Sequence, residues 1–448
     1  MGRADLQGVR AIVAGAGLAG LSAARELEAR GATTTVIEAR DRVGGRVWTL
    51  REAFVGRQHA EAGADLIEGE QEHVRRLAHE LGLKPVRILR DGFGFYGPDA
   101  RGKRRLHRRP GGFQAAATLL ADEIHDFKLA EERWDSAIAR RLASLSVVSW
   151  LETHQVPAHV RASVRAFRGF FLADPEELSV LPLVEQFAED GTPGQGHIYR
   201  IAEGNDRLAT VMARRLRGRL LLSTIVRRVR QRESQVTVTV EDGSGRRSEI
   251  AGDFLVCTLP ASTARDVVFE PKLPASQHDA IAGLRYGAAT RLLLQFDRRF
   301  WKKRGRPLAF GTDLATGAVW DGNEQQHGAG ILSFLAGGRA SSELQHVLNA
   351  DGAAGAIALV DWLGRPSRLL ASSAIVWDVD PWVRGGYAFF DPAFDPLWRA
   401  WLSRPCGRIV FAGEHTSMKW QGYMNGAIES GLRAAAEIAA LSESTKTR

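Results

Sequence analysis

Near its N-terminus the chain contains an apolar run that leads into closely spaced glycines: Val9-Arg10-Ala11-Ile12-Val13-Ala14-Gly15-Ala16-Gly17-Leu18-Ala19-Gly20. Apolar residues then recur at helical spacing until Gly31, so the segment predicts a strand, a tight turn and a helix. A second β-branched run, 33–37, ends in Glu38, twenty-one residues after Gly17. This order of strand, helix and strand predicts the βαβ unit of a dinucleotide-binding fold, in which an acid at this spacing holds a ribose.

The glycine pattern alone is weak evidence, because the chain has 47 glycines and glycine also serves ordinary turns. Its context strengthens it. Gly15, Gly17 and Gly20 follow a predicted strand and begin a predicted helix, whose N-terminus offers N–H donors and a positive dipole to a pyrophosphate. Glu38 is either a plain strand-end carboxylate or the ribose ligand, and its place at the carboxyl edge of the sheet favours the ribose.

Composition excludes several classes of protein. With 448 residues, 44% of them hydrophobic, the chain is too long for a single small binding module and rich enough to bury a core. Two cysteines, Cys257 and Cys406, are too few for a disulfide framework or a cysteine zinc site, and we expect no metal. No apolar stretch approaches a membrane span and no signal peptide is evident, so we expect a cytoplasmic protein without a membrane partner.

The net charge of +8 does not indicate a nucleic-acid partner. Much of the excess lies in one run, 101–109, which has no zinc pattern or RNA-binding signature beside it. We interpret this run as a solvated basic loop in preference to an anionic docking site.

The rest of the chain alternates between helical and strand-like spacing. Residues 114–189 are mostly helical, with candidate helices at 115–126, 136–142, 147–154 and 160–171. Strand-like spacing returns at 236–240 and 254–257, with a turn at Asp242-Gly243, and again at 290–296. The last part predicts a strand at 409–413 and a helix at 425–441, and we find no internal repeat.

The first motif continues as Glu38-Ala39-Arg40-Asp41-Arg42-Val43-Gly44-Gly45-Arg46, and with this continuation the sequence resembles the flavin-dependent monoamine and polyamine oxidases. The resemblance runs over most of the chain. It implies FAD as the cofactor, with Glu38 on the adenosine ribose and with Arg40, Gly44, Gly45 and Arg46 in the flavin site. The stretch 61–65 is similar to the family segment beside the isoalloxazine, which adds Gly63 and Ala64.

The C-terminal match is more specific, because it joins Phe411-Ala412-Gly413-Glu414-His415-Thr416 to Trp420-Gln421-Gly422-Tyr423-Met424-Asn425-Gly426-Ala427. By resemblance, Gly413 and Glu414 meet the pyrophosphate and ribityl chain. The segment with Gly422, Tyr423, Met424 and Ala427 begins a helix that points at the flavin, where its dipole stabilises negative charge on the reduced ring. Val226 resembles the residue that pairs with adenine through its backbone, although a plain strand valine would look the same.

Two tyrosines, Tyr387 and Tyr423, match the pair that flanks the amine in this family. Facing aromatic rings hold the apolar body of a neutral amine and orient its lone pair. Half-buried core tyrosines are common, but the chain has only five tyrosines and two fall in family motifs, so we favour the cage.

Several features depart from those of relatives. Gly386 stands where some relatives carry the cysteine that tethers the flavin, so we expect non-covalent FAD. Membrane-anchored relatives carry a C-terminal apolar helix, whereas this sequence stops soon after Leu441, so we expect no anchor. Leu66 stands near the position of an arginine that clamps the carboxylate of amino-acid substrates, which favours a simple amine.

Arg291 is the most informative departure, because many relatives have there a lysine that holds a water near flavin N5. Arginine keeps the positive charge but does not release a proton. Arg291 therefore either takes over the lysine's role, or clamps a substrate carboxylate, or forms a structural ion pair, in that order of preference.

These observations predict an α/β fold with a Rossmann-like FAD-binding domain (1–80, 200–280 and 400–448) and an interleaved α+β substrate-binding domain (81–199 and 281–399). The implied reaction is oxidation of an amine C–N bond with hydride transfer to flavin N5. The resulting imine hydrolyses to an aldehyde or ketone, and O2 is reduced to H2O2. An L-amino acid oxidase, a flavin-dependent desaturase or dehydrogenase that uses O2 poorly, and a non-catalytic flavin protein stay open as alternatives, as does the oligomeric state, a homodimer included.

Overall fold

The computed structural model describes residues 6–107, 116–190 and 196–446. Its centre is a five-stranded parallel sheet in the order β10 (Arg219–Leu221), β2 (Thr33–Ile37), β1 (Arg10–Ala14), β14 (Phe254–Cys257) and β23 (Ile409–Phe411). Four of its strands match runs that the sequence predicts. Segments far apart in the chain therefore meet in one sheet, and the predicted Rossmann-like α/β fold is confirmed.

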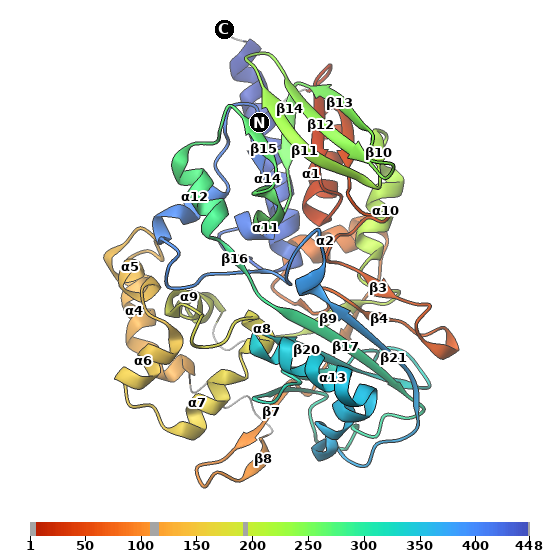
Figure 1. Ribbon diagram of the computed structural model, residues 1–448, viewed down its shortest axis with the longest axis vertical. Helices are drawn as coiled ribbons and strands as arrows, with labels where there is room; N and C mark the ends of the chain where they lie inside the picture. Colours follow the sequence, from red (N-terminus) through yellow and green to blue (C-terminus); the bar gives the residue numbers. More distant parts are fainter. Residues whose placement is uncertain (1–5, 108–115, 191–195, 447–448) are drawn as a thin grey trace.

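Two long helices, α1 (Leu18–Ala29) and α14 (Met424–Lys446), pack together beside this sheet (Figure 1). Their contact requires a residue without a side chain. A Cβ atom at Gly431 would lie 2.3 Å from the carbonyl oxygen of Ala19. The C-terminal helix can therefore lie directly against the first helix of the chain, which brings both flavin motifs to the same edge of the sheet.

The turn between β1 and α1 is closed by two glycines. Gly15 has a φ of +108°, a conformation that residues with a side chain rarely adopt. A Cβ atom at Gly20 would lie 1.9 Å from the Gly15 carbonyl oxygen, so no larger residue fits there.

A four-stranded sheet lies in the upper part of Figure 1. Its strand order is β13 (Arg247–Gly252), β12 (Val236–Asp242), β11 (Thr224–Gln231) and β15 (Val268–Glu270). The turn after Asp242 was predicted, but it leads into β13 and not to the strand at 254–257. Exposed residues fill β13, so its sequence lacks the alternation that identifies a half-buried strand.

The second large layer is a seven-stranded sheet in the lower half of Figure 1. The strand order is β21 (Leu369–Val376), β17 (Ala289–Phe296), β20 (Gly330–Gly337), β19 (Ala318–Asp321), β18 (Ala309–Thr312), β7 (Phe93–Pro98) and β8 (Arg104–His107). Strand β17, which lies between β21 and β20, is buried along its whole length and carries Arg291.

The basic run is a strand over part of its length, and the prediction of a loop was wrong there. Residues of β8 pair with β7, and Arg104 and Arg105 form ion pairs with Asp313 and Asp99, at 2.6 and 2.8 Å. Acids just after β7 and β18 thus pair with the arginines of this charged edge strand. Residues 108 and 109 lie outside the described part.

The helical block is confirmed, with boundaries that differ from those predicted. Ser136 caps α5 (Ala137–Ala143), and its side chain accepts a hydrogen bond from the Ala139 N–H. The segment 160–171 is not one helix but two. The block contains α4 (Ala121–Leu129), α6 (Val147–Thr153), α7 (Ala158–Arg165), α8 (Arg168–Phe171) and α9 (Val180–Asp190).

The described part also contains the α-helices α2 (Glu72–Leu81), α10 (Arg207–Arg215), α11 (Ala261–Ala264), α12 (Ala275–Gly283) and α13 (Arg339–Ala358). Short strands are β3 (Thr49–Leu50), β4 (Ala60–Glu61), β5 (Ile67–Glu68), β6 (Pro85–Ile88), β9 (Ile198–Ile201), β16 (Arg285–Tyr286) and β22 (Ala388–Phe389), and 3-10 helices are η1 (Val55–Arg57), η2 (Asp361–Leu363), η3 (Trp377–Val379), η4 (Pro396–Leu402) and η5 (Glu414–Thr416). Among the helices described, none is long and apolar enough to cross a membrane.

Candidate active site

One cavity of about 650 Å³ runs from the carboxyl edge of the parallel sheet to the seven-stranded sheet. Of the residues that the sequence predicts for the site, Gly20 alone does not line it, because Gly20 closes the turn beneath. The residues that do line it are Gly15, Gly17, Glu38, Arg40, Gly44, Gly45, Arg46, Gly63, Ala64, Val226, Arg291, Tyr387, Gly413, Glu414, Gly422, Tyr423, Met424 and Ala427.

Glu38 lies at the end of β2 with its carboxylate turned back to the glycine turn. Its Oε2 accepts the Ala16 N–H at 2.8 Å and its Oε1 accepts the Arg40 N–H at 2.9 Å. Burial raises the pKa of Glu38, and the two backbone N–H groups oppose this shift. Since each carboxylate oxygen has a second lone pair, Glu38 can also accept hydroxyl groups of a ribose.

The turn leaves a cradle that fits a pyrophosphate. A Cβ atom at Gly17 would meet nothing within 4 Å. No side chain caps α1 at Gly17, and the first N–H groups of a helix have no intrahelical acceptor. Gly44 is fixed beside them, because its N–H donates to the Ala16 carbonyl at 2.9 Å. Open space lined by free backbone donors is what a bound phosphate requires.

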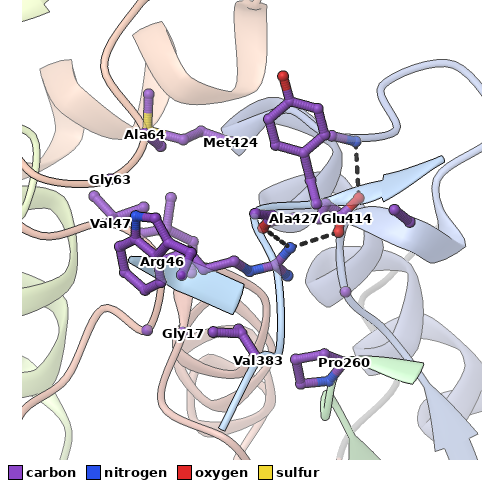
Figure 2. A pocket seen from close by; sticks show the side chains of 18 of the residues that line it. Gly17, Arg46, Val47, Gly63, Ala64, Pro260, Val383, Glu414, Met424 and Ala427 are labelled. Atoms are coloured by element: carbon purple, nitrogen blue, oxygen red, sulfur yellow. Dashed lines mark hydrogen bonds and ion pairs between the residues drawn. The ribbon is translucent and has the colours of Figure 1, made fainter. Parts of the chain in front are cut away.

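Arg46 and Glu414 join the two flavin motifs (Figure 2). The Arg46 Nη1 lies 2.7 Å from Glu414 Oε1 and 3.0 Å from the Gly386 carbonyl oxygen, while Glu414 Oε2 accepts the Gly422 N–H at 2.8 Å. Burial opposes ionisation of Glu414, but the Arg46 charge and hydrogen bonds hold its pKa below the ordinary value. Glu414 is therefore an ionised carboxylate, and its bonds to Arg46 and Gly422 shape the floor of the cavity.

The segment with Gly63 and Ala64 passes directly over Arg46. A Cβ atom at Gly63 would lie 1.8 Å from the Arg46 carbonyl oxygen, and the Ala64 N–H donates to that same oxygen at 3.0 Å. Only glycine permits this approach. The Gly63 carbonyl then points to Arg291.

Arg291 is buried and lies at the cavity wall. Its Nη2 donates to the Gly63 carbonyl at 2.8 Å, its Nη1 to Ser333 Oγ at 3.0 Å, and its guanidinium carbon lies 4.6 Å from the centre of the Trp320 ring. Burial lowers the pKa of Arg291, whereas the charge of Asp65 acts in the opposite direction. Arg291 forms no ion pair with any residue in the described ranges, which disagrees with the interpretation as a structural ion pair.

The two tyrosines line the same cavity but are held differently. The Tyr387 hydroxyl donates to the Phe170 carbonyl, so this ring presents its face and not its hydroxyl. Tyr423 packs edge-on against Trp420, with ring centres 5.7 Å apart. Gly422 lies beside the Tyr387 ring, where a Cβ atom would be 3.3 Å from Cδ2.

Gly386 and Leu66 also lie at the cavity wall. A Cβ atom at Gly386 would lie 2.3 Å from Leu172 Cδ1, so a tethering cysteine would have to displace Leu172. Leu66 adds apolar surface.

Sequence reasoning missed two groups of site residues. Thr258, Leu259 and Pro260 line the cavity because they follow β14. Ligands of parallel sheets bind at the carboxyl ends of the strands, so the position of these residues directly after a predicted strand could have identified them. The second group had no local signal: Asp65 accepts hydrogen bonds from Arg200 Nε at 2.6 Å and Trp320 Nε1 at 2.7 Å, and thereby fixes the ring under Arg291.

Residues 18–439 match the sequence model of the flavin-containing amine oxidoreductases, so the chain belongs to this family. The chain is 28% identical to a protein of Mycobacterium tuberculosis assigned as flavin-containing monoamine oxidase AofH, over 97% of both chains. It is 26% identical to the L-amino acid dehydrogenase of Synechocystis sp., over 96% of this chain and 94% of that one.

Two solved structures have the same fold. Cyclohexylamine oxidase from Brevibacterium oxydans aligns with a TM-score of 0.85 at 24% identity, over 97% of this chain and 99% of the other. Putrescine oxidase bound to putrescine aligns with a TM-score of 0.84 at 24% identity, over 97% and 100% of the two chains. The protein is thus a flavoprotein oxidoreductase of the amine oxidase class, as predicted.

Proposed function

We propose that the protein binds FAD without a covalent link and uses it to oxidise the C–N bond of a small amine. The observation that carries this proposal is the continuity of one cavity, from the phosphate cradle at Gly17 to the rings of Tyr387 and Tyr423. A dinucleotide in the cradle would extend toward the place where these rings can hold a substrate.

Different residues of the chain would hold different parts of FAD. Glu38 would hold the adenosine ribose, the N-terminus of α1 the pyrophosphate, and the backbone of Val226 the adenine. Arg40 would lie near the adenosine, and an ion pair with Asp380, 2.7 Å away, holds its side chain. The beginning of α14 would direct its positive dipole at the flavin. When bound, FAD would accept the hydride from the carbon beside nitrogen and pass the electrons to O2, leaving an imine that hydrolyses.

The chain would position the amine and one water. Tyr387 and Tyr423 would hold the apolar body of the substrate and exclude bulk water. Arg291 would supply a fixed positive charge at the flavin. Its Nε–H has no acceptor among the described residues, so a water or substrate atom can complete its hydrogen bonding.

The two large sheets would belong to two domains with different roles. We propose residues 1–80, 200–280 and 400–448 as the cofactor domain and 81–199 and 281–399 as the substrate domain. The parallel sheet and the seven-stranded sheet support this division, since their strands fall into these ranges.

Oxidation of an L-amino acid is the second candidate, because Arg291 is a cavity cation that can pair with a carboxylate. The L-amino acid dehydrogenase among the relatives supports keeping it. Leu66 at the cavity wall favours the simple amine.

A panel of amines and L-amino acids, scored both for peroxide and with an artificial electron acceptor, tests the proposal. We expect peroxide with primary amines and little with amino acids. Turnover of amino acids alone would select the second candidate, and turnover only with the artificial acceptor would remove O2 from the scheme. Acid precipitation should release all yellow colour into the supernatant, whereas colour in the pellet would contradict non-covalent binding.

A further inference from the structure

Helix α9 presents two different faces. Leu181, Val184 and Ala188 are buried in the core of the helical block. Pro182, Glu185 and Gln186, at positions i, i+3 and i+4, share the other face and line the cavity. Helix α9 thus presents a carboxylate and an amide to the cavity.

One carboxylate oxygen of Glu185 has no hydrogen-bond partner among the described residues. Its Oε1 accepts the Trp134 indole N–H at 2.6 Å. Within the described part of the chain, no group donates a hydrogen bond to Oε2. The side-chain amide of Gln186 has no hydrogen-bond partner there either. The Trp134 bond fixes the side chain, so Oε2 is held in place for an incoming donor.

A second pair in the same helical block shows what a purely structural pair looks like. Glu123 accepts the Trp150 indole N–H at 2.9 Å, is only 8% exposed, and does not line the cavity. The chemistry of the two pairs is the same. Their difference is that Glu185 opens onto the cavity.

The cation nearest in charge effect to Glu185, Arg399, does not form a hydrogen bond with it. Arg399 is fully buried between the Trp134 and Phe390 rings, and its guanidinium donates to the carbonyls of His415 and Ser417 and not to Glu185. Burial raises the pKa of Glu185 to about 7, with Arg399 opposing and Glu132 assisting the shift. An approaching cation would favour the carboxylate form.

Apolar residues connect Tyr387 to Glu185. Phe389 and Phe390 follow Tyr387 in the chain and line the cavity, and the centre of the Phe390 ring lies 4.7 Å from the centre of the ring of Trp134, which donates to Glu185. Lys419 also lines the cavity but is exposed and lies over the Trp420 ring, 5.4 Å from its centre. A ligand that extends from Tyr387 to Glu185 therefore meets apolar walls and then the Glu185 carboxylate.

We propose that Glu185 is a specificity-determining residue that binds a second positively charged group of the substrate, separated from the reacting nitrogen by an apolar chain. This inference rests on the proposed amine oxidation and names its substrate class: amines with a distal ammonium or guanidinium group. Gln186 would add a neutral hydrogen bond to the same group.

The kinetic test compares α,ω-diaminoalkanes with n-alkylamines of equal length. We expect the parent to prefer the diamine in kcat/KM by at least about tenfold. Glu185→Gln, which keeps an acceptor for Trp134, should lower kcat/KM for the diamine by about tenfold to a hundredfold and leave the monoamine unchanged. The matched control Glu123→Gln should not change the ratio. Equal losses for both substrates in Glu185→Gln would overturn the proposal.

A binding measurement decides the question without turnover. Calorimetry on the FAD-loaded protein compares α,ω-diguanidinoalkanes with alkylguanidines, which carry the charge but no reactive amine. We expect the second guanidinium to strengthen binding in the parent and in Glu123→Gln but not in Glu185→Gln. The same affinity for both compounds in the parent would overturn the role of Glu185 even if no amine is oxidised, whereas oxidation of monoamines with no diamine preference would overturn it and leave the proposed function intact.

Discussion

Arg46 Nη1 and Glu414 Oε1 lie 2.7 Å apart although 368 positions separate the two residues in the chain. Arg46 follows the first glycine motif and Glu414 follows β23, so this pair fastens together the two ends of the cofactor site. Glu414 is 5% exposed, and breaking such a pair leaves an uncompensated buried charge.

We therefore expect Arg46→Met and Glu414→Gln to weaken FAD binding. A loss of roughly 3 kcal/mol would raise the dissociation constant by about a hundredfold. Titration of the apoprotein with FAD, followed by flavin fluorescence, measures this constant. The control is Arg10→Met, which breaks the exposed pair with Asp253 at 2.9 Å and should leave FAD affinity unchanged. Normal affinity in both site variants would show that the pair does not shape the cofactor site.

The two tyrosines should affect turnover and not cofactor content. Replacing Tyr387 or Tyr423 with alanine should lower amine turnover per flavin by at least about tenfold, since the rings orient substrate and touch no phosphate site. Tyr387→Phe should lose little, because the hydroxyl donates to the Phe170 carbonyl and is not presented to substrate. Steady-state rates normalised to bound flavin measure the effect. Unchanged rates in both alanine variants would remove the cage.

Arg291→Met should slow reoxidation of the reduced flavin by about a hundredfold and leave anaerobic reduction by amine largely intact. The reason is that the fixed charge acts on the step that develops negative charge near the flavin. Arg291→Lys should restore most of the rate, because it keeps the charge. Rapid mixing of each half-reaction makes the measurement. Weakened affinity for amino acids with unchanged reoxidation would instead assign Arg291 to a substrate carboxylate.

The parts of the fold that the sequence could predict are those encoded by neighbouring residues. The run from Val9 to Gly20 contains its own strand, turn and helix signals, and Ser136 marks the beginning of α5 with its own side chain. The resemblance supplied the C-terminal motif, and its Gly413 and Glu414 line the cavity.

The parts that could not be predicted depend on partners distant in sequence. Asp65 is fixed by Arg200 and Trp320, and nothing near any of the three indicates the others. Likewise, Glu185 reads as one polar residue on an amphipathic helix until Trp134 and the cavity are placed beside it. Tertiary contacts of this kind have no period or motif.

Glu61 predicts a pH dependence of stability. Its carboxyl is fully buried and accepts the Asn205 N–H at 3.0 Å and the Thr49 hydroxyl at 2.8 Å, and burial together with the Asp65 charge raises its pKa to about 8. Between the ordinary pKa of 4.5 and about pH 8, the folded protein therefore holds a proton that the unfolded chain has released. Stability contributed by this group is present below pH 4.5 and is lost as pH rises through that window, by up to about 1.4 kcal/mol per pH unit.

Glu61→Gln should flatten the fall of the free energy of unfolding over that window. Denaturant unfolding at a series of pH values measures it, with excess FAD present throughout. Glu249→Gln, an exposed carboxylate in β13, is the control and should leave the slope unchanged. A slope that is the same in Glu61→Gln and the parent would contradict the buried, protonated Glu61.

The central claim is that this cavity brings an amine to a bound flavin, and anaerobic rapid mixing of the FAD-loaded protein with the amine panel tests it most directly. We predict that at least one amine bleaches the oxidised flavin absorbance at a rate that saturates with amine concentration, and that Tyr423→Ala lowers this rate. If every amine leaves the flavin oxidised while dithionite reduces it fully, the cavity does not serve amine oxidation and the account is wrong.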